Sequence, residues 1–213
     1  AEPRLQRLYE RLIVAHLSES QRVAAGLHPP PAETSPFAAV QAAWRFYANE
    51  RIALPQLAGP LIAWARGGAV LQADQWLLNV LDWSPLHYAR HRSKADRVEL
   101  AHRKDLGYDL LTALVVSDRD GSPIAPVCLE VEAADGVHST RSATPLPSVS
   151  RLDGLTPVIE YVEGLALGRR VVHVIDREAD SVGHFRQWHA AGRCFLVRAD
   201  DDRRVRHEGR ECR

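Results

Sequence analysis

The ten residues VVHVIDREAD, at positions 171–180, decide how we interpret the fold. Their first half is a short β-branched run, which is typical of a strand buried on both faces of a sheet. The run stops at Asp176, and a carboxylate at the end of a buried strand is held rigidly while it still meets solvent. That placement suits a metal ligand or a general base. The alternative is that Asp176 caps a helix beginning near Ser181, since Asp favours that position.

The surrounding elements follow a mixed order. The expected strands are residues 77–82, 108–116, 124–131, 171–175 and 194–198, the expected helices are 157–167 and 181–191, and residues 133–155 form a loop. An Asp/Gly turn at 118–121 joins the second and third strands into an antiparallel hairpin. The order β-β-β-α-β-α-β matches an RNase-H-like mixed sheet, an α/β fold in which the first and fourth strands are central neighbours.

This topology makes neighbours of two acids that lie far apart in the sequence. Asp82 ends the first expected strand, and Asp176 ends the fourth. Two adjacent carboxylates repel each other unless cations neutralise them, and Mg²⁺ or Mn²⁺ prefers such oxygen ligands. Two such ions about 3.5–4 Å apart activate a water and stabilise the leaving oxygen in phosphodiester cleavage. The sequence therefore predicts a divalent-metal site at this edge of the sheet.

The N-terminal part is predicted to be helical. Leu5, Leu8 and Leu12 have helical spacing, Ser35 and Pro36 suit a helix start, and a third helix from Pro55 is expected to end at the glycines 67 and 68. We expect an all-helical region at residues 1–70, followed by a catalytic domain at 71–213. The helical region is either a plain cap on that domain or a small DNA-binding module.

The composition limits the classes of protein to which this chain can belong. The 213 residues are 46% hydrophobic and 25% charged, as in ordinary globular chains, and no apolar stretch approaches the roughly 18 residues of a membrane span. Three scattered cysteines favour a reducing cytosol over a disulfide framework. The spacing of His184, His189 and Cys194 does not fit a zinc site. The formal net charge is zero, but residues 90–104 are strongly basic, as DNA phosphates would require.

Several stretches resemble one known family. They are DREAD at 176–180, FLVRADDDR at 195–203, DWSPLHY at 82–88, GYDLLTALVVSDRDGSPI at 107–124 and AAWRFYANERI at 42–52. In this order they are similar to the DDE transposases of bacterial insertion sequences, in the insertion-sequence-four family that includes the transposon-five transposase. The likeness covers nearly the whole chain. DREAD is its most specific part, and Trp83-Ser84 departs from the two threonines usual in the family.

The resemblance implies roles for individual residues. Asp82 and Asp176 take the first two places of the DDE triad, as catalytic metal ligands. Ser84 and Tyr88 match positions beside the first acid, and Glu178 and Asp180 are supports. The implied DNA contacts are Arg90, Arg92, Lys94, Arg103, Lys104, Arg177, Arg198 and Arg203.

The implied function is cut-and-paste transposition. The resemblance implies Mg²⁺, with Mn²⁺ as a substitute, double-stranded DNA as the partner, a homodimer in the DNA complex and a cytoplasmic, nucleoid-associated location with no membrane. The family's third acid is a glutamate on a later helix. Glu208 and Glu211 lack the Y-x-x-R that precedes it. We therefore expect an incomplete catalytic domain. The alternatives are a truncated transposase that binds DNA without cleaving it, and an unrelated metal-dependent nuclease of the same fold.

Overall fold

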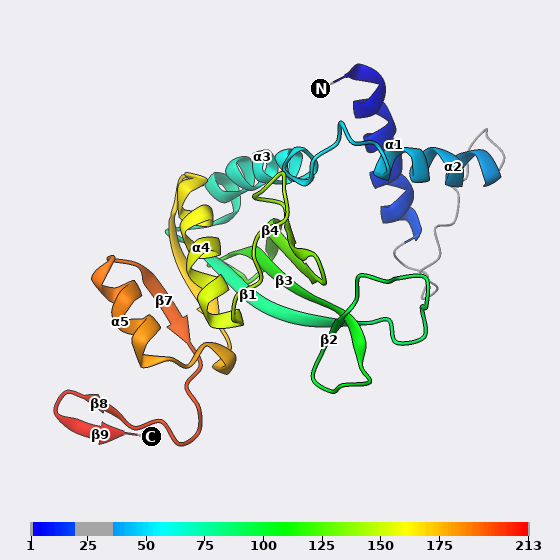
Figure 1. Ribbon diagram of the computed structural model, residues 1–213. Coiled ribbons are helices and arrows are strands. Elements are labelled where there is room, and N and C mark those ends of the chain that lie inside the picture. The colour runs from blue at the N-terminus through cyan, green and yellow to red at the C-terminus, as the bar shows by residue number, and fades with distance from the viewer. Residues whose placement is uncertain (1, 20–35, 213) are drawn as a thin grey trace. The chain divides into compact units, whose positions relative to one another are not determined.

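The computed structural model describes residues 2–19 and 36–212 (Figure 1). The chain divides into two compact units, Ala1–Ala53 and Leu54–Arg213, and each is described by itself. The second unit is an α/β fold with a mixed sheet, as the sequence predicts. No helix in the described part of the chain is both long and apolar enough to cross a membrane.

Aromatic contacts join the two described helices of the first unit, α1 (Pro3–Glu19) and α2 (Pro36–Tyr47). Tyr9 of α1 stacks on the buried ring of Phe46 in α2, with 5.8 Å between the ring centroids. Both helices were expected from the spacing of their apolar residues. The expected cap at Ser35 lies outside the described residues.

The third helix, α3 (Leu54–Gln72), belongs to the second unit. Ala65 and Ala69 on one of its faces and Ala73 just after it are buried in the core that covers the sheet. The division between the units therefore falls before α3, whereas the sequence placed it between residues 70 and 71. A helical stretch looks the same in sequence whether it packs on other helices or on a sheet, so the pattern alone did not show this.

The same helix runs through Gly67 and Gly68, where the sequence predicts its end. A Cβ atom on Gly68 would lie 2.8 Å from Cγ2 of Ile124 in the sheet, whereas one on Gly67 would meet no atom within 4 Å. The prediction was wrong because Gly68 serves close packing of the helix on the sheet instead of terminating it.

The sheet of the second unit contains most of the described strands. They are β1 (Trp76–His87), β2 (Val98–Glu99), β3 (Leu106–Ser117), β4 (Pro123–Ala133), β5 (Gly136–Ser139), β6 (Arg170–Ile175) and β7 (Cys194–Val197). The strand order is β5-β4-β3-β1-β6-β7, with the short β2 beside β3. β1 is antiparallel to β3 and parallel to β6, and β6 is parallel to β7. The expected neighbours, the first strand and the strand at 171–175, are therefore adjacent.

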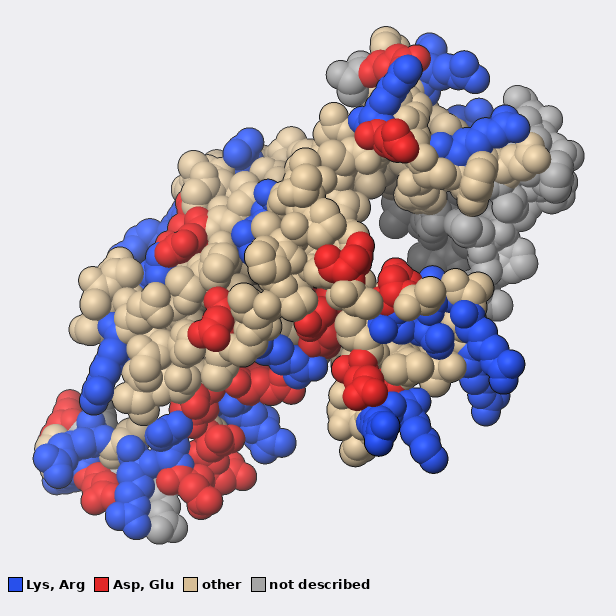
Figure 2. Space-filling view, in the orientation of Figure 1, with Lys and Arg blue, Asp and Glu red and all other residues tan. Residues whose placement is uncertain are grey.

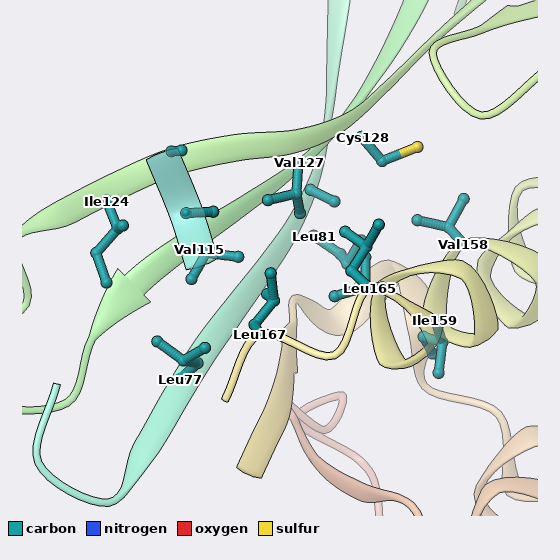
Figure 3. Close-up of a cluster of buried hydrophobic side chains, with 14 of the residues drawn as sticks. Leu77, Leu81, Val115, Ile124, Val127, Cys128, Val158, Ile159, Leu165 and Leu167 are labelled. Carbon is teal, nitrogen blue, oxygen red and sulfur yellow. The ribbon is translucent and has the colours of Figure 1, made fainter. Parts of the chain in front are cut away.

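The core lies on one face of this sheet. Along β1, every second residue from Leu77 to Leu81 is buried, as a half-covered strand requires. The helix α4 (Arg151–Gly164) covers this face, and α5 (Val182–Ala190) adds the buried Trp188. Figure 3 shows part of the core, with Leu77, Leu81, Val115, Val127, Val158 and Ile159 gathered between strands and α4.

The loop predicted at residues 133–155 needs correction. The stretch 133–155 contains β5 and the first turn of α4, which begins at Arg151 instead of residue 157. Its N-cap is Ser150, whose Oγ accepts a hydrogen bond from the backbone N–H of Asp153. Pro157 was taken for the start of the helix but lies inside it. The charged tail forms a separate hairpin of β8 (Val205–His207) and β9 (Arg210–Cys212).

Candidate functional site

The register of β1 and β6 brings the two predicted acids together. Leu81 of β1 pairs with Ile175, the last residue of β6. Asp82 and Asp176 are the next residues on these neighbouring strands, which in a sheet lie about 4.8 Å apart. Both aspartates are exposed to solvent. The expectation that they are neighbours is confirmed at the level of the sheet register.

Asp82 does not end its strand, as the sequence suggested. β1 continues to His87 and remains paired with β3 along that length. The apolar run stops at Leu81 because β6 stops beside it, so that the rest of β1 has a neighbour on one side only. The prediction took the end of the apolar run for the end of the strand.

A third charged residue extends the pair into a row. Val197 of β7 pairs with Ile175, and the backbone N–H of Arg198 donates to the carbonyl of Ile175 at 3.1 Å. Arg198 is exposed and follows β7 just as Asp176 follows β6. We call Asp82, Asp176 and Arg198 the acid–arginine row. The register places Arg198 on the strand next to Asp176, and its implied contact with DNA stays a prediction.

Asp176 also has the capping role that was its alternative. Its backbone is extended, and its Oδ1 accepts a hydrogen bond from the backbone N–H of Glu178 at 2.9 Å. The helix that it caps is η1 (Arg177–Ala179), a single 3₁₀ turn. The N-cap of α5 is Ser181 itself, so the predicted partner of the cap was wrong. Capping occupies Oδ1 and orients the carboxylate beside Asp82.

The neighbours of Asp82 divide between the two faces of the sheet. Ser84 Oγ donates to Asp82 Oδ2 at 3.4 Å, which agrees with a role in orienting that carboxylate. Trp83 packs against the core on the opposite face. The departure from two threonines therefore keeps one hydroxyl beside the acid and adds a large apolar side chain to the core.

The last acid of the DREAD motif is held inside the fold. The side chain of Asp180 is 1% exposed, and Arg203 lies 2.9 Å from each of its carboxylate oxygens. The backbone N–H of Asp200 donates to Oδ2 at 2.8 Å. The hydrogen bond from Arg203 is the main reason that the pKa of Asp180 lies below its usual value. Arg203, an implied DNA contact, is thus engaged in anchoring the segment after η1.

Sequence reasoning missed an arginine beside the site. Arg151, the first residue of α4, contacts Asp109 Oδ2 through Nε at 2.8 Å and Glu178 Oε2 through Nη1 at 2.5 Å. Asp109 lies on β3 and is buried. A single carboxylate in the apolar strand 108–116 indicates that a basic side chain pairs with it in the fold, because a buried unpaired charge is strongly unfavourable. The sequence does not say which cation.

A cavity of about 220 Å³ lies beside this arginine, on the helix-covered side of the sheet. Its charged lining comes from Asp109, Glu130, Glu132, Arg141 and Arg151. Arg141 Nε donates to Glu130 Oε1 at 2.6 Å, so a second arginine–glutamate pair lines the same cavity.

The basic stretch 90–104 is folded on itself. Arg97, half-buried, donates to the backbone carbonyls of Lys94 at 2.6 Å and Tyr88 at 2.7 Å. Lys94 Nζ lies 4.9 Å from the centroid of the Tyr88 ring and 5.6 Å from that of Tyr108. The hydroxyl of Tyr108 donates to Asp96 at 2.6 Å, and this bond raises the pKa of Tyr108 to about 12.

These contacts leave the other basic side chains of the stretch at the surface. Arg90, Arg92, Arg103 and Lys104 are exposed. Figure 2 shows basic side chains gathered over this loop, with few acidic ones among them. Of the implied DNA contacts here, Lys94 packs on aromatic rings while the other four face solvent. Arg177, in η1, is also exposed.

The described residues bring two carboxylates together without a third. No group of three or more His, Cys, Asp or Glu side chains forms a metal-binding cluster within 2–19 and 36–212. Glu211 instead pairs with Arg204 in the C-terminal hairpin, at 3.4 Å.

Comparison with known proteins does not assign the chain to a family. No protein-family model matches the chain, and no curated protein matches it. The functional argument therefore depends on the residues and their arrangement.

Proposed function

We propose that this chain is a DNA transposase of the DDE type, which cleaves and transfers DNA strands at transposon ends with the help of Mg²⁺. One observation carries the proposal: Asp82 and Asp176 are exposed neighbours at the point where β6 ends. The strand order β4-β3-β1-β6-β7, with β1 antiparallel to β3 and parallel to β6, supports an RNase-H-like topology. The DREAD motif supplies the second acid of the pair.

The donor set fits a hard divalent cation. Asp82 and Asp176 offer carboxylate oxygens on adjacent strands, and their mutual repulsion favours a cation between them. The cap on η1 engages Oδ1 of Asp176, and the bond from Ser84 engages Oδ2 of Asp82, so both carboxylates are oriented before a metal binds. When bound, Mg²⁺ supplies activation of water and stabilisation of the leaving oxygen.

Basic residues around the acids would hold the DNA. Arg198 in the acid–arginine row lies where a phosphate brought to the two acids would meet it. Arg177 and the exposed arginines and lysine of the 90–104 loop would contact the flanking phosphates, which positions DNA without reading its sequence. Arg203 acts differently, by anchoring Asp180. A homodimer on double-stranded DNA in the bacterial nucleoid is the assembly that this function requires.

A second candidate is a DNA-binding protein that does not cleave. The observation that favours it is the exposed basic surface of the 90–104 loop, whose contacts with DNA phosphates would not depend on the two acids. Such a protein would occupy transposon ends or pair with an active enzyme and inhibit it.

One experiment separates the two candidates. Nicking of supercoiled DNA and binding of labelled duplex are measured with Mn²⁺ for the wild type, Asp82→Asn and Asp176→Asn. Asn caps a helix as well as Asp does, so Asp176→Asn removes the charge and keeps η1. Asp201→Asn, at an exposed acid of the tail, is the matched control.

For the transposase we expect metal-dependent nicking that falls to background in both site variants and persists in the control. DNA binding without nicking supports the second candidate. Nicking that survives both substitutions contradicts the proposed site.

A further inference from the structure

Arg151 touches the segments that carry both acids. Its Nη1 bonds Glu178, which lies in the turn capped by Asp176. Its guanidinium carbon lies 5.8 Å from the ring centroid of Trp83, the residue after Asp82. Its Nε bonds Asp109 on the other strand that flanks β1.

The turn beside Asp176 needs such support. η1 contains three residues, and the backbone bonds that close it are those from Ala179 to Asp176 at 3.2 Å and from Asp180 to Arg177 at 3.0 Å. A single 3₁₀ turn is not stable alone. Its position therefore depends on its side chains, of which Ala179 is fully buried.

Two ion pairs flank this turn. Asp180 pairs with Arg203, which comes from the segment after β7, and Glu178 pairs with Arg151, which comes from α4. Arg203 therefore ties the turn to a surface segment. Arg151 ties it to the helix that covers the sheet and, through Asp109 and Trp83, to β3 and β1.

Asp109 holds the guanidinium in place. The side chain of Asp109 is 9% exposed, whereas those of Arg151 and Glu178 are 44% and 47% exposed. Burial alone would lower the pKa of Arg151, but the hydrogen bonds and charges of Asp109 and Glu178 together raise it above the usual value. Loss of Arg151 would leave Asp109 buried without its cation.

We propose that Arg151 is a positioning residue, which sets the distance between the carboxylates of Asp82 and Asp176 by fixing η1 and Trp83 to one guanidinium. The inference rests on the proposed metal-dependent function of the two acids. Arg151 does not bind the metal, and its contribution is the geometry of the two acids.

The direction of one effect distinguishes positioning from simple electrostatics. Removal of a positive charge near two carboxylates favours a bound cation, so that charge alone predicts tighter Mn²⁺ binding. Loss of positioning predicts weaker binding, because partners that orient metal ligands contribute about 10- to 100-fold in affinity.

The test uses the whole chain and Mn²⁺, with bound metal measured by electron paramagnetic resonance. The variants are Arg151→Met, Arg151→Lys and Glu178→Gln. A further variant, Asp176→Asn, removes one of the two acids and so shows which part of the bound Mn²⁺ is held by them. Arg141→Met is the matched control, because it removes an arginine from a pair with a buried glutamate on the same cavity. Glu178→Gln changes a half-exposed residue, so its metal-free hydrogen exchange, described below, keeps the inference testable if Arg151→Met does not fold.

We expect Mn²⁺ affinity to fall about 10-fold or more in Arg151→Met, to fall less in Glu178→Gln, and to recover in part in Arg151→Lys. Arg141→Met should retain wild-type affinity. Unchanged or tighter binding in both Arg151→Met and Glu178→Gln overturns the inference.

A second measurement does not depend on the metal. Hydrogen exchange of the Ala179 and Asp180 amides, measured without metal, should be about 10-fold faster in Arg151→Met and Glu178→Gln and unchanged in Arg141→Met. If the wild type binds no Mn²⁺ at the acids, the proposed function fails and the exchange rates decide the inference. Equal exchange rates in all variants overturn it.

Discussion

Asp176 combines two roles in one side chain. Its Oδ1 accepts the Glu178 N–H and so fixes the turn, and the same bond orients the carboxylate next to the position of Asp82. A cap and a metal ligand are often treated as rival interpretations of an aspartate at a strand end. Here the cap restricts the rotamers of the side chain, which would lower the entropy cost of binding a metal at the proposed site.

Another residue-scale network lies in the sheet below the acids. His173 of β6 is fully buried, its Nδ1 is 3.0 Å from Asn79 Nδ2, and its Nε2 is 3.4 Å from Glu163 Oε1. The Asn79 amide donates to Nδ1, so the ring proton is on Nε2 and points to Glu163. Burial is the main reason that the pKa of His173 lies below 6.5, although Glu163 opposes the shift.

This lowered pKa predicts a loss of stability at mildly acidic pH. Below pH 6.5 the unfolded chain binds a proton at His173 that the folded chain does not, so the free energy of unfolding falls as the pH falls. The slope for one group is at most about 1.4 kcal/mol per pH unit. Urea unfolding of the wild type and His173→Gln between pH 8 and pH 5 measures it.

The variant should show a shallower pH dependence than the wild type. His138→Gln is the control, because His138 is partly exposed and pairs with the exposed Asp135. An equal slope in wild type and His173→Gln would mean that the buried histidine has no part in the acid sensitivity.

At the scale of elements, α3 is fixed to the sheet by a close contact. Gly68 lies where a Cβ would come within 2.8 Å of Ile124, a buried β-branched side chain with little freedom to move. We expect Gly68→Ala to lower the free energy of unfolding by up to about 2 kcal/mol, the cost of overpacking less the gain in helix propensity. Chemical denaturation measures the change.

The adjacent glycine provides the matched control. A Cβ on Gly67 meets no atom within 4 Å, so Gly67→Ala should gain helix propensity, about 0.8–1 kcal/mol. Stabilisation by both substitutions would show that α3 does not pack closely on β4.

The sequence predicted which helices and strands are present better than it predicted the residues at which they end. The strands β1, β3, β4, β6 and β7 were found because β-branched runs and the Asp/Gly turn are local signals, whereas the short strands β2 and β5 were missed. β1 extends beyond its apolar run because β3 still pairs with it, and α3 passes through two glycines because one of them packs on Ile124. Both ends depend on tertiary neighbours, which local patterns do not report.

At the scale of the whole molecule, the structure and the sequence give different domain boundaries. The second unit begins at Leu54, and α3 contributes Ala65, Ala69 and Ala73 to its core. We therefore expect residues 54–213 to fold alone, with one cooperative thermal transition. Residues 71–213 should not, because they leave the apolar side chains under α3 exposed. Circular dichroism and differential scanning calorimetry of the two fragments test this.

The full chain, residues 1–213, provides the reference temperature for the thermal unfolding of the second unit. A cooperative transition of residues 71–213 at the same temperature as that of 54–213 would restore the boundary expected from the sequence.

That Asp82 and Asp176 are neighbours could be predicted from the order of the elements. The contacts that hold their segments in place could not. The order β-β-β-α-β-α-β limits the sheet to few topologies, and one of them puts Asp82 beside Asp176. The contacts of Arg151 with Asp109 and Glu178 join three elements with no shared spacing. Such ion pairs depend on side-chain geometry, which the order of elements leaves open.

The parallel pairing of β1 with β6 also determines when the site can exist. During synthesis, β1, β3 and β4 leave the ribosome first and can pair as an antiparallel meander that carries Asp82 alone. Asp176 follows only after α4 and β6, and Arg198 follows after β7. A nascent chain thus holds half of the acid pair while most of its sheet is already made. The two carboxylates could share the proposed cation only after β6 has been translated and has paired with β1.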